Sequence, residues 1–297
     1  MLDVKDDIND IIDLGIKLKT KVKAGETVHH LKGKTLGMIF EKSSTRTRVS
    51  FEVGMEHLGG HALFLSKNDI QLGRGETIED TALVLSRYVD LIMYRAMSNK
   101  AMKDLAAHAT VPVISGLDDK EHPCQVVTDL MTIKEHKKKL KGLRFVYLGD
   151  GGNNMSHSYL LGCAMVGMDV KIVTPKKYWP DQYYIDAAKK FGGEVEVTDD
   201  VSDATSGADV VATDTWVSMG DEAQKQQRLN DFKDYTITSD MMNKADKDAI
   251  FLHCLPAYYD YEVTKDVAHG PQSVIFDEAE NRMWAQMAIM VTLDKSR

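Results

Sequence analysis

The chain contains little cysteine, no excess of basic residues and no long apolar run, and each absence excludes a class of protein. Its cysteines, Cys124, Cys163 and Cys254, are too few and too scattered for a disulfide framework or a structural zinc site. A net charge of −8 argues against a general nucleic-acid binder, because such proteins usually carry a basic face. No apolar run approaches the roughly 20 residues that cross a membrane, and the acidic segment 1–7 does not resemble a signal peptide. We therefore expect a cytoplasmic protein without nucleic-acid or membrane partners.

The remaining composition, with 43% hydrophobic and 28% charged residues, is that of a globular protein whose 297 residues fit two domains of about 150. Short apolar runs alternate with segments of helical periodicity in both halves. The expected strands are residues 35–40, 61–65, 91–95, 111–115, 144–148, 170–174, 194–198, 209–213 and 250–255, and 273–276 is a further short apolar run. The expected helices are residues 3–24, 49–55, 77–88, 100–107, 122–136, 154–166, 185–191, 221–232 and 279–293, with 122–136 as a bridge between domains. This alternation predicts an α/β fold of two domains, each a parallel sheet flanked by helices, with ligands at the carboxyl ends of the strands.

The segment from Ser44 to Arg48 lies at the expected junction between strand 35–40 and the helix that follows it. At such a junction the first N–H groups of the helix have no partner within it, and the helix dipole is positive. Hydroxyl groups and the guanidinium groups of Arg46 and Arg48 add donors suited to phosphate oxygens. The segment therefore predicts a phosphate-binding site. The alternative is an N-cap residue followed by two solvent-facing arginines.

Polar residues also follow other expected strands and helix starts. Arg95 ends an apolar strand, where it is either a ligand-binding cation or a charge at the rim of the sheet. His122 and Gln125 open the bridging helix, and they either polarise a carbonyl group of a ligand or serve as capping and core residues. Asp214 follows strand 209–213, where a carboxylate can bind an amine and accept its proton or simply stabilise a turn. Cys254 is either a buried inert thiol or a reactive one near a cation such as Arg282.

The glycine-rich segment Gly149–Asn154 follows a strand and opens a helix, as a dinucleotide-binding turn does. The G-x-G-x-x-G pattern requires glycine where Asn154 stands, and no acidic residue is evident about 20 positions further on. The match is therefore weak. Asn154 can equally cap the helix or bind a ligand through its amide.

Five motifs, in this order along nearly the whole chain, resemble those of the aspartate/ornithine carbamoyltransferase family. They are Ser44-Thr45-Arg46-Thr47-Arg48, His122-Pro123-x-Gln125, Asp214-x-x-x-Ser218-Met219-Gly220, His253-Cys254-Leu255-Pro256 and Glu280-Asn281-Arg282. The resemblance implies transfer of the carbamoyl group of carbamoyl phosphate to the side-chain amine of L-ornithine, giving L-citrulline and phosphate. It also implies a carbamoyl phosphate-binding domain in residues 1–132, an ornithine-binding domain in residues 133–279, and a C-terminal helix, about residues 280–297, that packs back on the first domain.

The same resemblance implies the residues of the site. Carbamoyl phosphate would be bound by Ser44, Thr45, Arg46, Thr47, Gln71, Arg95, His122, Gln125, Cys254, Leu255 and Arg282. Ornithine would be bound by Asn154, Asp214, Ser218 and Met219, and Ser-Met-Gly resembles the ornithine signature of the family. Gln71 would reach the site of a neighbouring subunit, which implies a homotrimer or an assembly of trimers.

The implied catalytic residues are Asp214, Cys254, Arg95 and His122. Asp214 and Cys254 are the candidates to accept the proton of the amine, and Arg95 and His122 would stabilise the oxyanion. No metal and no cofactor is expected. Three other functions stay open at this point: carbamoyl transfer to another amine such as putrescine or acetylornithine, a nicotinamide-dependent oxidoreductase built on Gly149–Asn154, and a non-catalytic relative.

Overall fold

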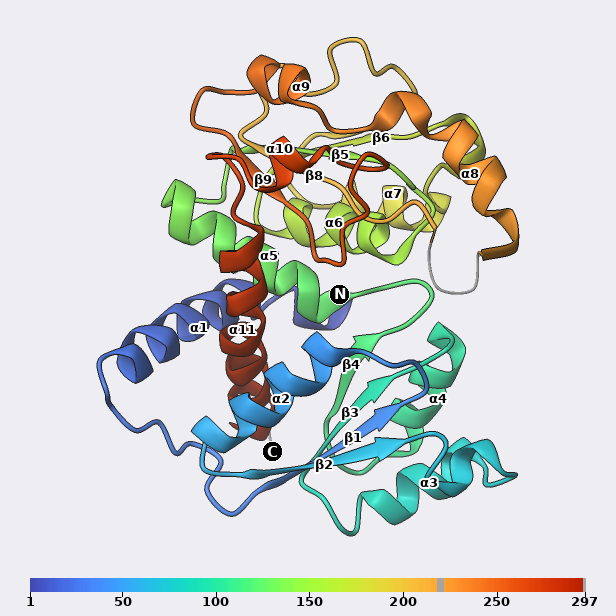
Figure 1. Cartoon of the computed structure of the whole chain (residues 1–297). Coiled ribbons are helices and arrows are strands. Elements are labelled where there is room, and N and C mark those ends of the chain that lie inside the picture. The colour runs from blue at the N-terminus through green and yellow to red at the C-terminus, as the bar shows by residue number, and fades with distance from the viewer. Residues whose placement is uncertain (218–221, 296–297) are drawn as a thin grey trace. The chain divides into compact units, whose positions relative to one another are not determined.

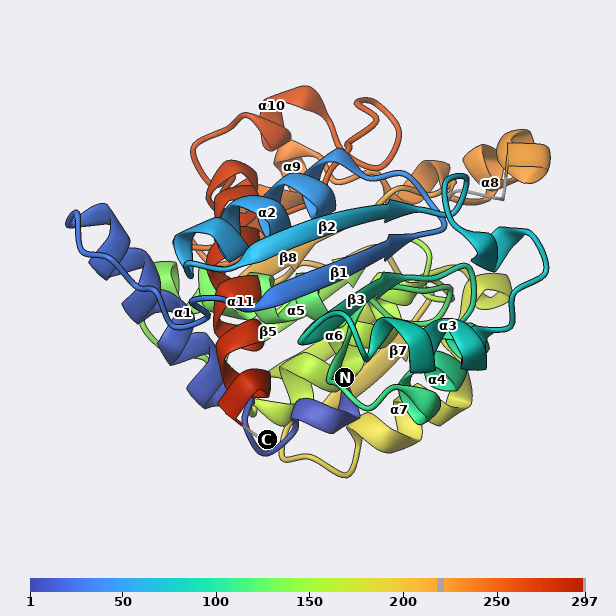
Figure 2. The same cartoon turned by 90° about the horizontal axis from the view of Figure 1, so that it is seen from below.

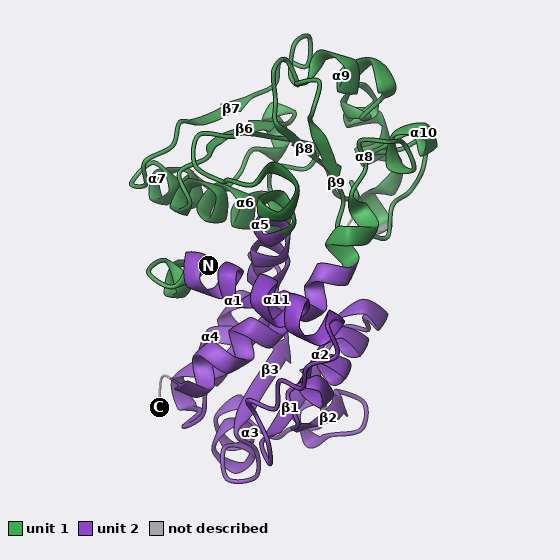
Figure 3. Cartoon of the chain, turned by 90° about the vertical axis from the view of Figure 1, so that its left-hand side faces the viewer, with its two compact units in different colours: residues 1–8, 132–279 green, residues 9–131, 280–297 purple. Residues whose placement is uncertain are grey.

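The computed structural model describes residues 1–217 and 222–295, so Ser218 and Met219 of the predicted ornithine site lie outside the described residues. The chain forms two compact units, each built around one parallel sheet (Figure 3). Unit 1 comprises Met1–Ile8 and Thr132–Ala279, and unit 2 comprises Asn9–Met131 and the residues from Glu280 onward. The predicted two-domain α/β class is confirmed.

Unit 2 contains a four-stranded sheet in the order β2-β1-β3-β4. Its strands are β1 (Thr35–Phe40), β2 (His61–Ser66), β3 (Leu91–Arg95) and β4 (Val113–Leu117). Its helices are most of α1 (Ile8–Lys23), α2 (Thr45–His57), η2 (Gln71–Gly73), α3 (Ile78–Leu85), α4 (Asn99–His108), the first part of α5 (Pro123–Lys137) and the later part of α11 (Ile275–Lys295). Figure 2 shows β1 between β2 and β3, and the register places Phe40 beside Arg95. The polar residues that follow β1 therefore begin next to Arg95.

Helices cover both faces of this sheet because its strands are joined by crossover connections, which are right-handed in parallel sheets. The chain moves outward from β1 to β2 through α2 and then back across β1 to β3 and β4 through α3 and α4. Helix α2 consequently lies on one face, and α3 and α4 lie on the other (Figure 1). Ile39, Ile92 and Tyr94 are fully or almost fully buried in the core beneath α3 and α4. This core fixes the carboxyl ends of β1 and β3.

Unit 1 contains a five-stranded sheet in the order β7-β6-β5-β8-β9. Its strands are β5 (Arg144–Leu148), β6 (Asp169–Val173), β7 (Val195–Thr198), β8 (Val210–Ala212) and β9 (Ile250–Leu252). Besides the end of α5 and the start of α11, its helices are η1 (Leu2–Val4), α6 (Asn154–Met165), η3 (Lys176–Tyr178), α7 (Gln182–Ala188), η4 (Glu222–Gln224), α8 (Lys225–Asp231), η5 (Lys233–Tyr235), α9 (Ser239–Lys244) and α10 (Lys265–Ala268). Trp216, Phe232 and Val263 belong to one buried cluster on this sheet, so the segments after β8 and β9 are anchored in the core.

Several boundaries differ from those expected. The apolar run 273–276 is not a separate element, because α11 already begins at Ile275. Strand β9 ends at Leu252, so His253, Cys254 and Leu255 belong to the loop that follows it. Helices α9 and α10 were not predicted, since six and four residues carry too little periodicity to detect. Within residues 1–217 and 222–295, every helix is too short or too polar to cross a membrane.

Candidate functional site

The turn between β1 and α2 in unit 2 is closed by Ser44, which is the N-cap residue of α2. The Ser44 hydroxyl accepts a hydrogen bond from the N–H of Thr47 at 3.3 Å and donates one to the Thr47 hydroxyl at 3.0 Å. Thr45 is exposed and Arg46 is half-buried in the first turn, where the N–H groups lack partners within the helix. The predicted phosphate-binding residues therefore surround the positive end of a 13-residue helix.

Arg282 of α11 connects this turn to α5 within unit 2. One of its guanidinium nitrogens, Nη2, donates to the Thr47 hydroxyl at 2.8 Å, and the other, Nη1, donates to the side-chain oxygen of Gln125. Arg282 is 3% exposed and Gln125 is fully buried. The Gln125 amide nitrogen donates in turn to Asp129 at 2.8 Å. The structure thus joins three predicted residues and adds Asp129, which sequence reasoning missed although it lies one helical turn after Gln125.

The charge of Arg95 acts on the imidazole of His122. Arg95 is the last residue of β3, His122 directly precedes α5, and both are buried. Burial lowers the pKa of His122 well below its usual range, and the charges of Arg282, Arg95 and Arg46 lower it further. The imidazole is therefore neutral at physiological pH, with one ring nitrogen as a donor and the other as an acceptor. Three cations and a neutral imidazole suit a ligand that has both negative charge and a carbonyl group.

Two other residues singled out in the sequence, Arg48 and Gln71, form their contacts outside this group of residues in unit 2. Arg48 is exposed, forms an ion pair with Glu52 at 3.0 Å and stacks on the ring of Phe64 at 3.9 Å. Gln71 is exposed in η2, where its carbonyl oxygen accepts hydrogen bonds from the N–H groups of Arg74 and Glu76. Of the two arginines in the Ser44–Arg48 segment, Arg46 is the one whose charge acts on His122.

In unit 1, the structure brings Asp214 and Cys254 together at the ends of neighbouring strands. The thiol of Cys254 donates a hydrogen bond to Oδ1 of Asp214 at 3.3 Å. Asp214 is 8% exposed, and burial raises the pKa of its carboxyl group. A carboxylate with a raised pKa beside a half-buried thiol is suited to bind a cationic amine and take a proton from it.

Asn153, which sequence reasoning passed over in favour of Asn154, makes the direct contact with Asp214. Its amide nitrogen donates to Oδ2 of Asp214 at 3.4 Å and to the Tyr147 hydroxyl at 3.0 Å. Its oxygen caps α6 by accepting from the N–H of Ser156 at 2.8 Å. Asn154 follows as the first residue of α6 and is half-buried. The signal for Asn153 was present, because Asn before a helix is a strong N-cap residue.

The loop carrying Cys254 and Leu255 is fixed by the buried side chain of His253. Its Nδ1 accepts from the N–H of Leu255 at 2.9 Å, so its Nε2 carries the proton and donates to Glu262 at 3.2 Å. Asp214, His253 and Cys254 offer three potential metal ligands within 4.8 Å of one another. Both ring nitrogens of His253 and the thiol of Cys254 are engaged in hydrogen bonds within the protein. The arrangement therefore fits a hydrogen-bonded loop better than a metal centre.

The glycine-rich turn after β5 does not form a cradle for a dinucleotide. The N–H of Gly151 donates to the Thr174 hydroxyl, and the N–H of Gly152 donates to Oδ1 of Asp150, each at 3.0 Å. A Cβ at Gly151 would lie 2.7 Å from the carbonyl oxygen of Tyr178, so the chain itself covers the turn. The other oxygen of Asp150 forms a buried ion pair with Arg228 at 2.9 Å. This geometry removes the basis for an oxidoreductase.

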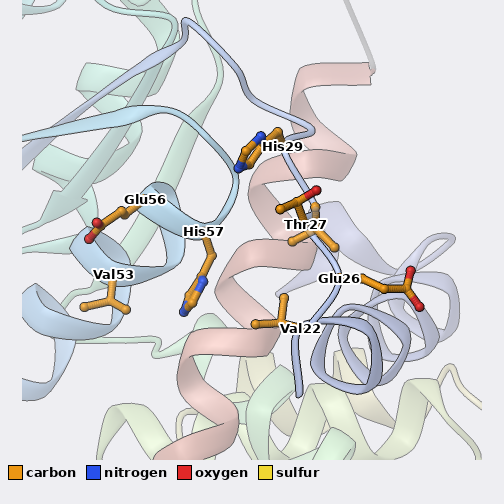
Figure 4. A pocket seen from close by; sticks show the side chains of 8 residues that line it. Val22, Glu26, Thr27, His29, Val53, Glu56 and His57 are labelled. Carbon is orange, nitrogen blue, oxygen red and sulfur yellow. The ribbon is translucent and has the colours of Figure 1, made fainter. Parts of the chain in front are cut away.

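A pocket of about 350 Å³ lies elsewhere in unit 2, between the ends of α1 and α2 (Figure 4). It is lined by Val22, Glu26, Thr27, Val28, His29, Val53, Glu56 and His57. The carboxylates of Glu26 and Glu56 point away from each other, and none of the lining residues belongs to the predicted site (Figure 4). The pocket is therefore separate from the turn that is predicted to bind phosphate.

The chain matches family models over most of its length. The model described as "Aspartate/ornithine carbamoyltransferase, carbamoyl-P binding domain" matches residues 2–135, and that described as "Aspartate/ornithine carbamoyltransferase, Asp/Orn binding domain" matches residues 141–293. The chain therefore belongs to the aspartate/ornithine carbamoyltransferase family.

Within this family, the chain is similar to proteins named ornithine carbamoyltransferase. That of Methanosarcina acetivorans is 50% identical over 289 residues, which are 97% of this chain and 95% of the relative. That of Caldicellulosiruptor saccharolyticus is 52% identical over 291 residues, covering 97% and 94% of the two chains. The solved ornithine carbamoyltransferase from Pyrococcus furiosus matches with a TM-score of 0.94 and 47% identity over 99% of this chain and 95% of that one.

Proposed function

We propose that this chain is an enzyme that transfers the carbamoyl group of carbamoyl phosphate to the side-chain amine of L-ornithine, releasing L-citrulline and phosphate. The observation that carries the geometric argument is the link from Arg282 to Gln125 and Thr47 at the N-terminal turn of α2. It forms a cationic site for a phosphate bearing a carbonyl group. The names of the relatives supply the acceptor, ornithine.

The two substrates are assigned to the two units. Unit 2 contains most of the segment matched by the carbamoyl phosphate-binding model, and we assign the phosphate to Ser44, Thr45, Arg46 and Thr47. We assign the carbamoyl group to Arg95, His122, Gln125 and Arg282, and the family resemblance adds Cys254 and Leu255. Unit 1 is also assigned ornithine, through Asn154 and Asp214, with Ser218 and Met219 as further ligands outside the described residues.

In the proposed mechanism, the δ-amine of ornithine binds as a cation, because the pKa of such an amine is about 10.4. Asp214, which accepts hydrogen bonds from Cys254 and Asn153, receives a proton from it, directly or through the thiol. The neutral amine attacks the carbamoyl carbon. Charge that develops on the carbonyl oxygen is stabilised by Arg95 and by the neutral, hydrogen-bonding imidazole of His122.

The intermediate then collapses, and the bond from the carbamoyl carbon to the phosphate oxygen breaks. The leaving phosphate takes both electrons of that bond and remains in the turn formed by Ser44–Thr47. The nitrogen of the product loses its second proton to the leaving phosphate as the carbonyl group re-forms. Asp214 and the leaving phosphate thus accept the two protons that the amine loses.

We further propose that the enzyme is a homotrimer or an assembly of trimers. Strand β2 is an edge strand of the sheet in unit 2, and its Leu63 is 41% exposed. Exposed edge strands and apolar residues favour association with another chain. Gln71, exposed in η2, is assigned to the site of a neighbouring subunit. Sedimentation velocity checks the assembly, and a monomer that is fully active would contradict it.

The proposed reaction is tested by measuring citrulline formation from carbamoyl phosphate and ornithine. Putrescine, acetylornithine and aspartate are supplied in parallel as competing acceptors. A strong preference for ornithine is the expected result. Preference for another amine would keep the carbamoyl phosphate half and reject the ornithine assignment. No turnover with any acceptor would favour a non-catalytic relative.

A further inference from the structure

Asp129 is a fully buried carboxylate on α5, one helical turn after Gln125. Its Oδ1 accepts a hydrogen bond of 2.8 Å from the amide nitrogen of Gln125. An ionised carboxylate is costly to bury, and it is retained where it makes charged or hydrogen-bonded contacts. The contact with a predicted ligand-binding residue therefore calls for an explanation.

The two neighbours of Gln125 determine which way its amide group faces. A carboxylate offers only acceptors, so it must face the –NH₂ group, and a guanidinium offers only donors, so it must face the oxygen. Asp129 and Arg282 satisfy these two requirements on opposite sides of Gln125. Without the acceptor at Asp129, this orientation of the amide would lose one of the two contacts that favour it.

The orientation matters because Arg282 extends the hydrogen-bonded series to the phosphate-binding turn. Its Nη2 donates to the Thr47 hydroxyl at 2.8 Å, and the Thr47 hydroxyl also accepts from Ser44 at 3.0 Å. The series Asp129, Gln125, Arg282 and Thr47 thus runs from the interior of unit 2 to the start of α2. A change at Asp129 would reach the turn through two intervening side chains.

We propose that Asp129 is a positioning residue for carbamoyl phosphate, which orients the Gln125 amide and through it holds Arg282 against Thr47. This inference rests on the proposed function for the identity of the ligand. The change in phosphate affinity that this role predicts for loss of Asp129 is opposite in sign to that of a simple charge effect. A negative charge behind the site would by itself weaken the binding of an anion, so its removal would strengthen binding. A positioning role predicts the reverse.

The test compares Asp129→Asn with Asp129→Leu. Asparagine removes the charge but keeps an oxygen that can accept from Gln125, whereas leucine has a similar size and offers no acceptor. We expect Asp129→Leu to raise both the KM for carbamoyl phosphate and the Kd for inorganic phosphate by about tenfold, equivalent to roughly 1.4 kcal/mol. Asp129→Asn should retain most of the affinity, and the KM for ornithine should change little in either variant.

Matched variants separate positioning from general damage. Asp90→Asn removes a carboxylate whose Oδ2 accepts from the N–H of Thr35 at the other end of β1, and it should leave phosphate affinity unchanged. In a Gln125→Met background, neither Asp129 variant should weaken phosphate binding further, because the amide it orients is gone. If Asp129→Leu fails to fold, Asp129→Ala, which likewise offers no acceptor, provides the same comparison with Asp129→Asn.

Equal effects of asparagine and leucine, tighter phosphate binding in either, or an undiminished effect in the Gln125→Met background would overturn the proposal. Calorimetric phosphate binding requires no turnover, so it reports on Asp129 independently of the acceptor. Failure of the wild-type enzyme to form citrulline, with the Asp129 effects intact, would count against the proposed function alone.

Discussion

The thiol of Cys254 donates a hydrogen bond to Oδ1 of Asp214 at 3.3 Å, while Asn153 donates to the other carboxylate oxygen at 3.4 Å. Both oxygens of a buried carboxylate are thereby held in a fixed orientation at the ends of β8 and β9. This pairing brings together an Asp and a Cys that are 40 positions apart, as our assignment of both to one amine requires.

Replacing Asp214 with Asn should reduce citrulline formation by about 10²–10⁴-fold, the usual contribution of a group that takes a proton in the transition state. Asparagine keeps an acceptor for Cys254 but is not a base. Steady-state kinetics measures the loss, and calorimetry with phosphate should show normal binding, because the assigned phosphate residues lie in unit 2. Asp203→Asn, at an exposed residue that pairs with Lys244, is the control. Turnover within about tenfold of wild type would reject Asp214 as the proton acceptor.

The same variant should gain stability at neutral pH. Burial raises the pKa of Asp214 above its ordinary value of 3.8, so the folded protein holds this proton more tightly than the unfolded chain. Stability therefore falls as pH rises from 3.8 towards the raised pKa, and the cost is constant above that.

Asp214→Asn removes this cost, so its Tm should exceed that of wild type at pH 7.5 and converge with it near pH 4. Each kcal/mol recovered corresponds to about 2–4 °C in domains of this size. Calorimetry across this pH range measures the difference. A wild-type Tm that is higher at neutral pH would mean that the ionised carboxylate is stabilising.

Arg46 and Arg48 provide a matched pair for the phosphate assignment. Arg46→Ala should raise the KM for carbamoyl phosphate by about 10–100-fold, since a hydrogen bond to a charged group is worth roughly 1.5–3 kcal/mol. Arg48→Ala should leave it nearly unchanged, because Arg48 is exposed and engaged with Glu52 and Phe64. Comparable effects of the two substitutions would show that general positive charge, rather than Arg46 itself, holds the phosphate.

Local features of the fold were predictable from the sequence. The alternation of apolar runs and helical periodicity located the strands of the two sheets to within a few residues, and the polar segment after residue 40 was placed correctly at the start of α2. Such features depend on neighbours along the chain.

Contacts between distant residues were not predictable in the same way. Arg282 contacts Gln125 and Thr47 across 157 and 235 positions, and no local pattern determines which face of α11 it occupies relative to α5 and α2. Asp129 and Arg228 were missed for the same reason, since a charged residue at helical spacing most often faces solvent. Only the folded chain shows that both are buried.

The ion pair between Arg228 and Asp150 provides the last prediction. Arg228 is 8% exposed, and its guanidinium group lies 4.9 Å from the centre of the Tyr178 ring. It connects α8 to the turn whose next residues are Gly151, Gly152 and Asn153. Removing one partner of a buried ion pair leaves an uncompensated charge and costs about 3–5 kcal/mol.

Arg228→Met should therefore lower the Tm clearly and raise the KM for ornithine more than that for carbamoyl phosphate, because the turn leads directly to Asn153 and Asn154. Adding Asp150→Asn should restore part of the Tm, since the charge is then absent while its oxygen still accepts from Gly152. Lys177→Met is the control, because Lys177 pairs with Asp231 of the same helix in an exposed position. If Arg228→Met and Lys177→Met had the same small effect, the pair would not anchor α8, and the ornithine site would have to be held by other contacts.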